Sequence, residues 1–162
     1  MVFILTLLSI YNAAFLLHLY PQQAFGLKEG APIKSCFHMM PKHPKTDSIN
    51  DIWEAQTGPS PYAINIQFPT LAKDQKQLIF LTGVAPTKLF RGFLAEVREA
   101  SDNATQPVGY FSSCPENTQP VKCANLIGAQ DNVFAVTHTY GFQSNAVELE
   151  WVPPSSGGSF KV

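Results

Sequence analysis

The sequence has 162 residues, of which 45% are hydrophobic and 14% charged, values typical of one globular domain with a modest core. The net charge of −1 excludes an overall positive field that would attract nucleic acid or an anionic membrane. The sequence has no phosphate-binding loop, dinucleotide-binding glycine motif or CxxC pair, so we expect no cofactor and no nucleic-acid partner.

The first 26 residues contain no Lys, Arg, Asp or Glu. An apolar run fills residues 2–19, interrupted by four polar side chains, and Ala24 and Gly26 fit the small-residue positions of a cleavage site. An uncleaved membrane anchor needs about 20 apolar residues, which the interruptions disfavour. We therefore expect a signal peptide at residues 1–26 and a secreted mature chain, residues 27–162, with no membrane span.

Secretion would place the three cysteines in an oxidising environment. One internal bridge is then expected, with one cysteine left over. A Cys36–Cys123 bridge would close a long loop and a Cys114–Cys123 bridge a short one, and the spacing leaves both open. A metal site is not expected, because Cys36, His38 and His43 do not have the spacing of a standard zinc site.

Residues 27–58 are predicted to be irregular, because Gly and Pro interrupt every periodic pattern. A strand follows at residues 62–68, whose larger apolar side chains share one face. Residues 77–82 are apolar on both faces, which predicts a buried strand. Residues 88–98 are also apolar on both faces and are predicted to form the central strand of the fold. Gly92 within them indicates a bulge or a close approach of two backbones.

The second half of the sequence is predicted to form shorter strands at residues 108–111, 133–139 and 145–151, with a loop at residues 112–123. In the last strand, Val147, Leu149 and Trp151 alternate with two glutamates, which predicts one buried and one exposed face. Short strands separated by turns indicate an all-β fold, an antiparallel β-sandwich.

A polar loop at residues 100–107 contains Asn103-Ala104-Thr105, the acceptor sequence for N-glycosylation. We expect Asn103 to lie on the surface and to carry a glycan if the chain is secreted.

Two features of the sequence could belong to a catalytic site. Glu148 and Glu150 share one strand face about 7 Å apart, which falls in the range of inverting glycosidases. Their alternation with apolar residues is better explained if the two glutamates form the solvent face of a half-buried strand. His138 has no nucleophile that the sequence places beside it, so structural hydrogen bonds at a strand end are expected. We expect no catalytic residues.

A basic stretch begins at Lys34 and includes Lys42 and Lys45, with two histidines between them. These three lysines are candidates for binding anions such as lipopolysaccharide phosphates or heparan sulfate. A solvated loop is the alternative.

The sequence resembles the reeler (reelin N-terminal) domain family in an ordered set of eight pieces. They are Gly30-Ala31-Pro32, Cys36 with Pro41 and His43, Ser60-Pro61-Tyr62, Phe90-Arg91-Gly92-Phe93-Leu94, Val108-Gly109-Tyr110-Phe111, Cys123, Val136-Thr137-His138 and residues 147–153. Within that family it is most similar to the single-domain secreted defence proteins of insects. The resemblance implies an immunoglobulin-like sandwich, an extracellular role in innate immunity, and pairing of Cys36 with Cys123 that leaves Cys114 odd.

The sequence departs from the family pattern in two places. The stretch between His43 and Ser60 is longer than expected, and the final strand of the family is barely begun at Phe160. We therefore expect residues 27–162 to form a reeler domain that is incomplete at its C-terminal end, with an exposed sheet edge and a core open beside Trp151.

These features predict a secreted immunity protein that binds microbial surface glycans or lipopolysaccharide without catalysis. The alternative is an adhesion module of the extracellular matrix that binds heparin, since reeler domains also occur in matrix proteins. The reeler part of a membrane ferric reductase is not expected, because no further hydrophobic span follows.

Overall fold

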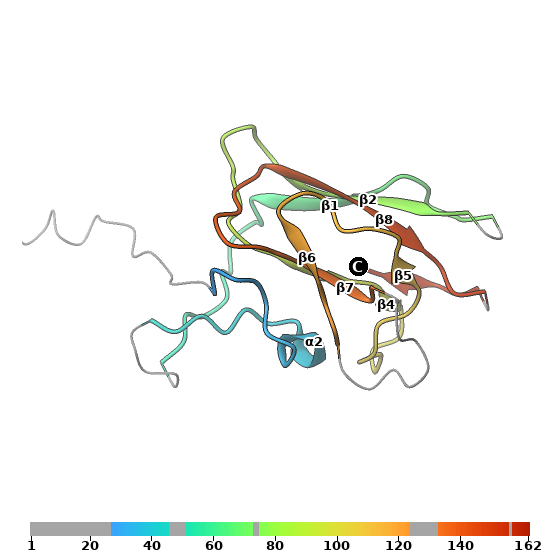
Figure 1. Cartoon of the computed structure of the whole chain (residues 1–162), viewed down its shortest axis with the longest axis horizontal. Coiled ribbons are helices and arrows are strands. Elements are labelled where there is room, and N and C mark those ends of the chain that lie inside the picture. Colours follow the sequence, from blue (N-terminus) through green and yellow to red (C-terminus); the bar gives the residue numbers. More distant parts are fainter. Residues whose placement is uncertain (1–26, 46–50, 73–74, 124–132, 156) are drawn as a thin grey trace, which may run out of the picture.

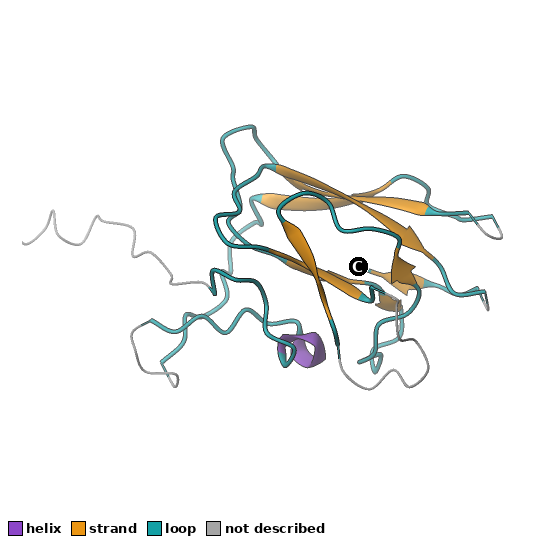
Figure 2. Cartoon of the chain, in the orientation of Figure 1, coloured by secondary structure: helices purple, strands orange, loops and turns teal. Residues whose placement is uncertain are grey.

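The computed structural model describes residues 27–45, 51–72, 75–123, 133–155 and 157–162. In that part of the chain one short helix accompanies nine strands (Figure 1, Figure 2). The elements are α2 (Ser35–His38), β1 (Tyr62–Ile66), β2 (Gln77–Gly83), β3 (Leu94–Glu96), β4 (Arg98–Glu99), β5 (Tyr110–Phe111), β6 (Thr118–Val121), β7 (Ala135–His138), β8 (Ala146–Val152) and β9 (Phe160–Lys161).

The strands form two main antiparallel sheets that face each other. The first has the order β1-β2-β8-β5 and the second the order β3-β7-β6, while β4 and β9 form a separate pair. The predicted all-β antiparallel sandwich is confirmed. Helix α2 lies on the side of the second sheet that faces away from the first (Figure 1).

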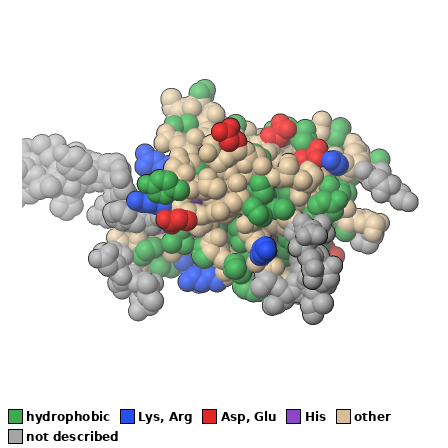
Figure 3. Space-filling model, viewed as in Figure 1, with side chains coloured by type: hydrophobic (Ala, Val, Ile, Leu, Met, Phe, Trp, Pro, Cys, Tyr) green, Lys and Arg blue, Asp and Glu red, His purple; other side chains and the backbone are tan. Residues whose placement is uncertain are grey.

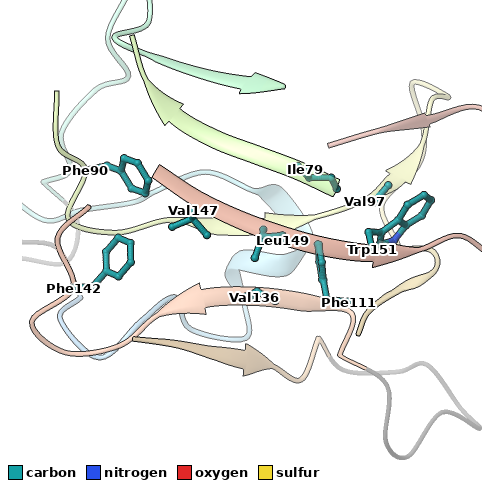
Figure 4. Close-up of a cluster of buried hydrophobic side chains, with 9 residues drawn as sticks. All are labelled: Ile79, Phe90, Val97, Phe111, Val136, Phe142, Val147, Leu149 and Trp151. Carbon is teal, nitrogen blue, oxygen red and sulfur yellow. The ribbon is translucent and has the colours of Figure 1, made fainter. Parts of the chain in front are cut away.

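Buried hydrophobic side chains from both sheets fill the space between them (Figure 4). The cluster comprises Ile79, Phe90, Val97, Phe111, Val136, Phe142, Val147, Leu149 and Trp151. In β8 the predicted alternation is confirmed, because Val147, Leu149 and Trp151 are buried and Glu148 is exposed. Removal of this apolar surface from water is the main source of stability.

The prediction of one central strand at residues 88–98 is wrong, because the segment passes from one sheet to the other. Phe90 bridges to Ser144, just before β8, whereas β3 pairs with β7 in the second sheet. Gly92 lies at the crossing, where a Cβ atom would stand 2.6 Å from His138 Cε1. The sequence predicted a bulge or a second backbone close to Gly92, whereas the close neighbour is the side chain of His138.

Three further predictions need correction. The loop expected at residues 112–123 contains β6, whose Pro120 is tolerated because β6 is an edge strand. The irregular residues 27–58 include α2. The strand predicted at residues 62–68 ends at Ile66, and this strand, β1, is the edge of the first sheet, with Ile64 and Ile66 53% and 49% exposed.

The core beside Trp151 is closed, contrary to expectation. β9 pairs with β4, and the ring of Phe160 packs against that of Trp151 with centroids 5.1 Å apart. Trp151 is consequently only 2% exposed.

The signal peptide predicted at residues 1–26 lies outside the described residues. Within the described ranges, the structure contains no helix long and apolar enough to span a membrane.

Candidate functional site

The first described segment, residues 27–38, is bound to the outer side of the second sheet by hydrogen bonds at the ends of β6 and β7. The Ala31 amide donates to Thr137 Oγ1 at 2.9 Å, and the side-chain amide of Gln119 donates to the Glu29 carbonyl. These contacts fix the path of the segment before it enters α2.

His138 contributes to the same attachment. Its Nδ1 accepts a hydrogen bond from the Phe93 amide at 3.1 Å, so Nε2 carries the proton and donates to the Leu27 carbonyl at 3.0 Å. The ring is buried at the end of β7. The structural role predicted for His138 is therefore confirmed.

A disulfide joins Cys36 in α2 to Cys123, shortly after β6, with Cα atoms 5.7 Å apart. Both cysteines belong to a second buried cluster, with Val121 and Ala135, on the outer side of the second sheet. This is the pairing that the resemblance implied. Cys114 remains a half-buried free thiol, and burial raises the pKa of this thiol.

A buried ion pair lies beside the disulfide. Arg98 Nε donates to the carboxylate of Glu96, which is 2% exposed, and the same guanidinium donates to the carbonyls of Cys36 and Ala104. Burial raises the pKa of Glu96, although the hydrogen bond and the charge of Arg98 oppose this shift. The sequence did not reveal this pair, since the two residues were assigned to a polar strand end.

Cys36, Glu96 and Cys123 bring their ligand atoms within 4.8 Å of one another, which is close enough to hold a metal ion. However, the two sulfur atoms are bonded to each other. They cannot act as thiolate ligands in this state, so the group does not constitute a metal site.

The three candidate lysines differ in their surroundings. Lys34, at the N-terminal cap of α2, and Lys42 are exposed, and neither belongs to an ion pair among the described residues. Lys45 lies 3.0 Å from the Asp51 carboxylate, and its Nζ lies 5.8 Å from the centroid of the Trp53 ring. Lys45 is therefore engaged within the protein, and Lys34 and Lys42 are the lysines available to a ligand.

The histidines of this stretch add little positive charge. Burial is the main cause that lowers the pKa of His43, and its electrostatic interaction with His138 adds to this shift. His38 Nδ1 accepts a hydrogen bond from the Met40 amide at 2.9 Å, which requires an unprotonated Nδ1. The charge of residues 27–45 therefore comes from four lysines against the single acidic residue Glu29.

Three exposed apolar side chains accompany these lysines. Ile33, Phe37 and Met40 are 49%, 48% and 49% exposed. Together with Lys34 and Lys42 they are called the α2 patch. The sequence did not reveal the apolar members, because Gly and Pro interrupt this stretch and no apolar period marks it.

Glu148 and Glu150 do not form an acid–base pair. Glu150 accepts hydrogen bonds from Lys76, at 2.6 Å, and from Ser112, and these two bonds lower the pKa of Glu150. An acid that protonates a leaving group requires a raised pKa instead. Both glutamates line an open surface groove beside β8, as the solvent face of a strand would.

Asn103 is exposed in its predicted loop.

Comparison with known proteins gave one family model, the Reeler domain, which matches residues 34–162. The chain is 31% identical to "Putative defense protein Hdd11" of Hyphantria cunea over 81% of this chain and 72% of that protein. It is 33% identical to "Putative defense protein" of Bombyx mori, over 77% of this chain and 66% of that protein. It is also 26% identical to "Putative ferric-chelate reductase 1 homolog" of Drosophila melanogaster, over 91% of this chain but only 21% of that protein.

Among solved structures, the human F-spondin reeler domain is similar, with a TM-score of 0.48 and 18% identity over 63% of this chain and 70% of that one. The family match covers most of the chain, and the resemblance seen in the sequence is confirmed. The chain belongs to the reeler domain family.

Proposed function

We propose that this chain is an extracellular defence protein that binds anionic components of microbial surfaces and catalyses no reaction. Two observations support this proposal. Relatives at 31% and 33% identity carry the name "Putative defense protein". In addition, Lys34 and Lys42 are exposed cations on a segment that a disulfide attaches to the sandwich.

The availability of Lys34 and Lys42 is the single observation on which the binding site rests. An ammonium group binds phosphate oxygens as a compact charge with three donors. The whole chain has a net charge of −1, so attraction must arise locally. Residues 27–45 supply that local charge, with four lysines against one glutamate.

The test is a pelleting assay with bacteria. Protein recovered from the medium of cells that express the full chain is mixed with bacteria at low and at moderate salt, and the bound fraction is measured. The site variant is Lys34→Gln/Lys42→Gln. The control is Lys88→Gln/Arg91→Gln, which removes the same charge from two exposed side chains between β2 and β3 that belong to no ion pair among the described residues.

We expect the parent and the control to pellet with the bacteria and the site variant to lose most of its binding. Equal loss in both variants would show that only net charge matters, and binding by all three alike would show that the lysines are not the site. Binding to heparin with no preference for bacteria would instead support the adhesion function.

Secretion is tested on the same sample by N-terminal sequencing. A first residue of Leu27 is expected, whereas a retained Met1 would contradict the extracellular proposal.

A further inference from the structure

We infer that the α2 patch docks onto an anionic lipid bilayer, with its lysines at the phosphate headgroups and its apolar side chains entering the boundary of the acyl chains. This inference rests on the proposed function and deepens it, because it identifies lipid as the part of the microbial surface that the patch contacts.

The short helical segment presents one apolar side to solvent. Within α2, Cys36 lies in the buried cluster beside the disulfide, whereas Phe37 and Ile33, which comes just before the helix, are exposed to solvent. The burial agrees: Cys36 is 3% exposed, while Ile33 and Phe37 are about half exposed, at 49% and 48%. Lys34, next to Ile33 in the sequence, is also exposed.

The apolar exposure is concentrated near the charge. Of the eleven strongly exposed large hydrophobic side chains in the described part of the chain, four fall within residues 27–45, together with four lysines. Figure 3 shows hydrophobic and Lys or Arg side chains side by side on the lower part of the visible surface, where Figure 1 places α2. Phenylalanine is normally buried, and an apolar patch rimmed by charge indicates an interaction surface.

The combination of side chains identifies the partner. A polysaccharide or heparin chain offers anions to the lysines but no apolar surface to aliphatic side chains such as Ile33 and Met40. An anionic bilayer offers both, with phosphates at the surface and acyl chains beneath them. The lysine side chains can lie along the boundary with their ammonium groups in the headgroup layer.

The patch is held rigidly before any contact is made. The Cys36–Cys123 disulfide, the Arg98 hydrogen bond to the Cys36 carbonyl and the Ala31 bond to Thr137 all fix the segment. Binding therefore requires little ordering of the chain, and this preorganisation favours affinity.

A second exposed apolar strip serves as the matched control. Ile64 and Ile66 on β1 are 53% and 49% exposed, as much as Ile33 and Phe37, but β1 contains no charged residue. If exposed apolar area alone drove lipid binding, the two strips would contribute equally. The inference requires that only the strip beside the lysines contributes.

The experiment is co-sedimentation with phospholipid vesicles, made of phosphatidylcholine alone or mixed with phosphatidylglycerol. The variants are Ile33→Ser/Phe37→Ser and the control Ile64→Ser/Ile66→Ser, with far-UV circular dichroism to show that each is folded. We expect the parent to bind the anionic vesicles preferentially. The patch variant should bind about tenfold to thirtyfold more weakly, from the loss of two half-buried contacts. The control should bind as the parent does.

The role of charge is measured with Lys34→Gln/Lys42→Gln. Each lysine near an anionic surface contributes about fivefold, so this variant should bind about 25-fold more weakly to the anionic vesicles. Moderate salt should weaken binding of the parent more than that of this variant.

Insertion is read directly with Phe37→Trp, which keeps an apolar ring at the position. Brominated acyl chains should quench the fluorescence of this variant more strongly than that of the parent. This readout does not depend on a loss of binding, so it remains valid if the serine variant fails to fold.

Failure of this inference can be distinguished from failure of the proposed function. If Ile33→Ser/Phe37→Ser binds vesicles as the parent does, or if Phe37→Trp shows no additional quenching, the lipid contact is refuted. Bacterial or heparin binding that still depends on Lys34 and Lys42 would then leave the proposed function standing. If the parent binds anionic vesicles but not bacteria, the proposed function fails instead.

Discussion

Removal of the Cys36–Cys123 disulfide should cost a large fraction of the stability of this domain. The two cysteines are 87 residues apart in the sequence. The chain-entropy model for a loop of that size gives a loss of about 4–5 kcal/mol in the free energy of unfolding. Because small domains have a total of about 5–15 kcal/mol, the variant Cys36→Ala/Cys123→Ala should be folded but marginal.

The structure also predicts where the variant opens first. Without the disulfide, residues 27–38 are attached mainly by hydrogen bonds from Ala31, Gln119, His138 and Arg98, each contributing about 1 kcal/mol or somewhat more. The core between the two sheets does not include either cysteine. The N-terminal segment should therefore detach before the sandwich unfolds.

The assay combines urea denaturation, followed by tryptophan fluorescence, with limited proteolysis. We expect a lower midpoint of denaturation and early cleavage within residues 27–45. The control is Cys114→Ala, which leaves the disulfide intact and removes a half-buried thiol. A loss below about 1 kcal/mol, or first cleavage within β2 or β8, would refute the reasoning.

Three other substitutions have definite expected outcomes. Arg98→Met leaves the Glu96 carboxylate buried without its partner and should cost about 3–5 kcal/mol at pH 7. Burial raises the pKa of Glu96, and loss of Arg98 removes the hydrogen bond and the charge that oppose this shift, so Glu96 takes up a proton more readily in the variant. The loss should therefore shrink as pH falls towards 4, and equal losses at pH 7 and pH 4 by urea denaturation would contradict the assignment. Gly92→Ala would put a Cβ 2.6 Å from the ring of His138 and should lower the melting temperature by several degrees, a shift that an unchanged calorimetric trace would exclude. Asn103→Gln should remove a glycan-sized mass from the secreted protein without changing its circular dichroism, and an unchanged mass would show that the site is unoccupied.

Strands could be predicted where the local pattern of apolar and polar residues shows which face of the strand is buried. β8 alternates apolar and acidic side chains, and burial follows that alternation along the strand. β2 is apolar on both faces and lies between two neighbours in its sheet. In both strands the two-residue alternation of side chains is enough to predict which of them are buried.

The segment at residues 88–98 was mispredicted because periodicity does not show that a chain changes sheets. In a single strand Phe90 and Phe93 would point to opposite faces. Both nevertheless pack at the main core, because the chain crosses between the sheets at Gly92. The glycine was recognised as a special position. The sequence around Gly92 does not show whether it lies at a bulge in one sheet or at a passage between two sheets. That depends on the pairing partners of this segment, Val136 and Ser144, which are more than 40 residues away.

The candidate site was half predictable. The lysines were found from charge density, but the ion pair that engages Lys45 depends on Asp51 across a turn. The apolar side of the α2 patch was missed because a sequence does not show whether Phe37 packs inward or outward. That direction is set by Cys36, whose burial depends on its bond to Cys123.

The most direct test of the account is hydroxyl-radical footprinting of the secreted protein with and without purified lipopolysaccharide. Phe37 and Met40 are reactive side chains in the α2 patch, and Tyr140, which is 71% exposed, reports on a part of the surface outside it. If the α2 patch is the binding site, lipopolysaccharide lowers the oxidation of Phe37 and Met40 and leaves that of Tyr140 unchanged. Protection of Tyr140 alone, or no protection of Phe37 and Met40 under conditions where the protein binds, would contradict it.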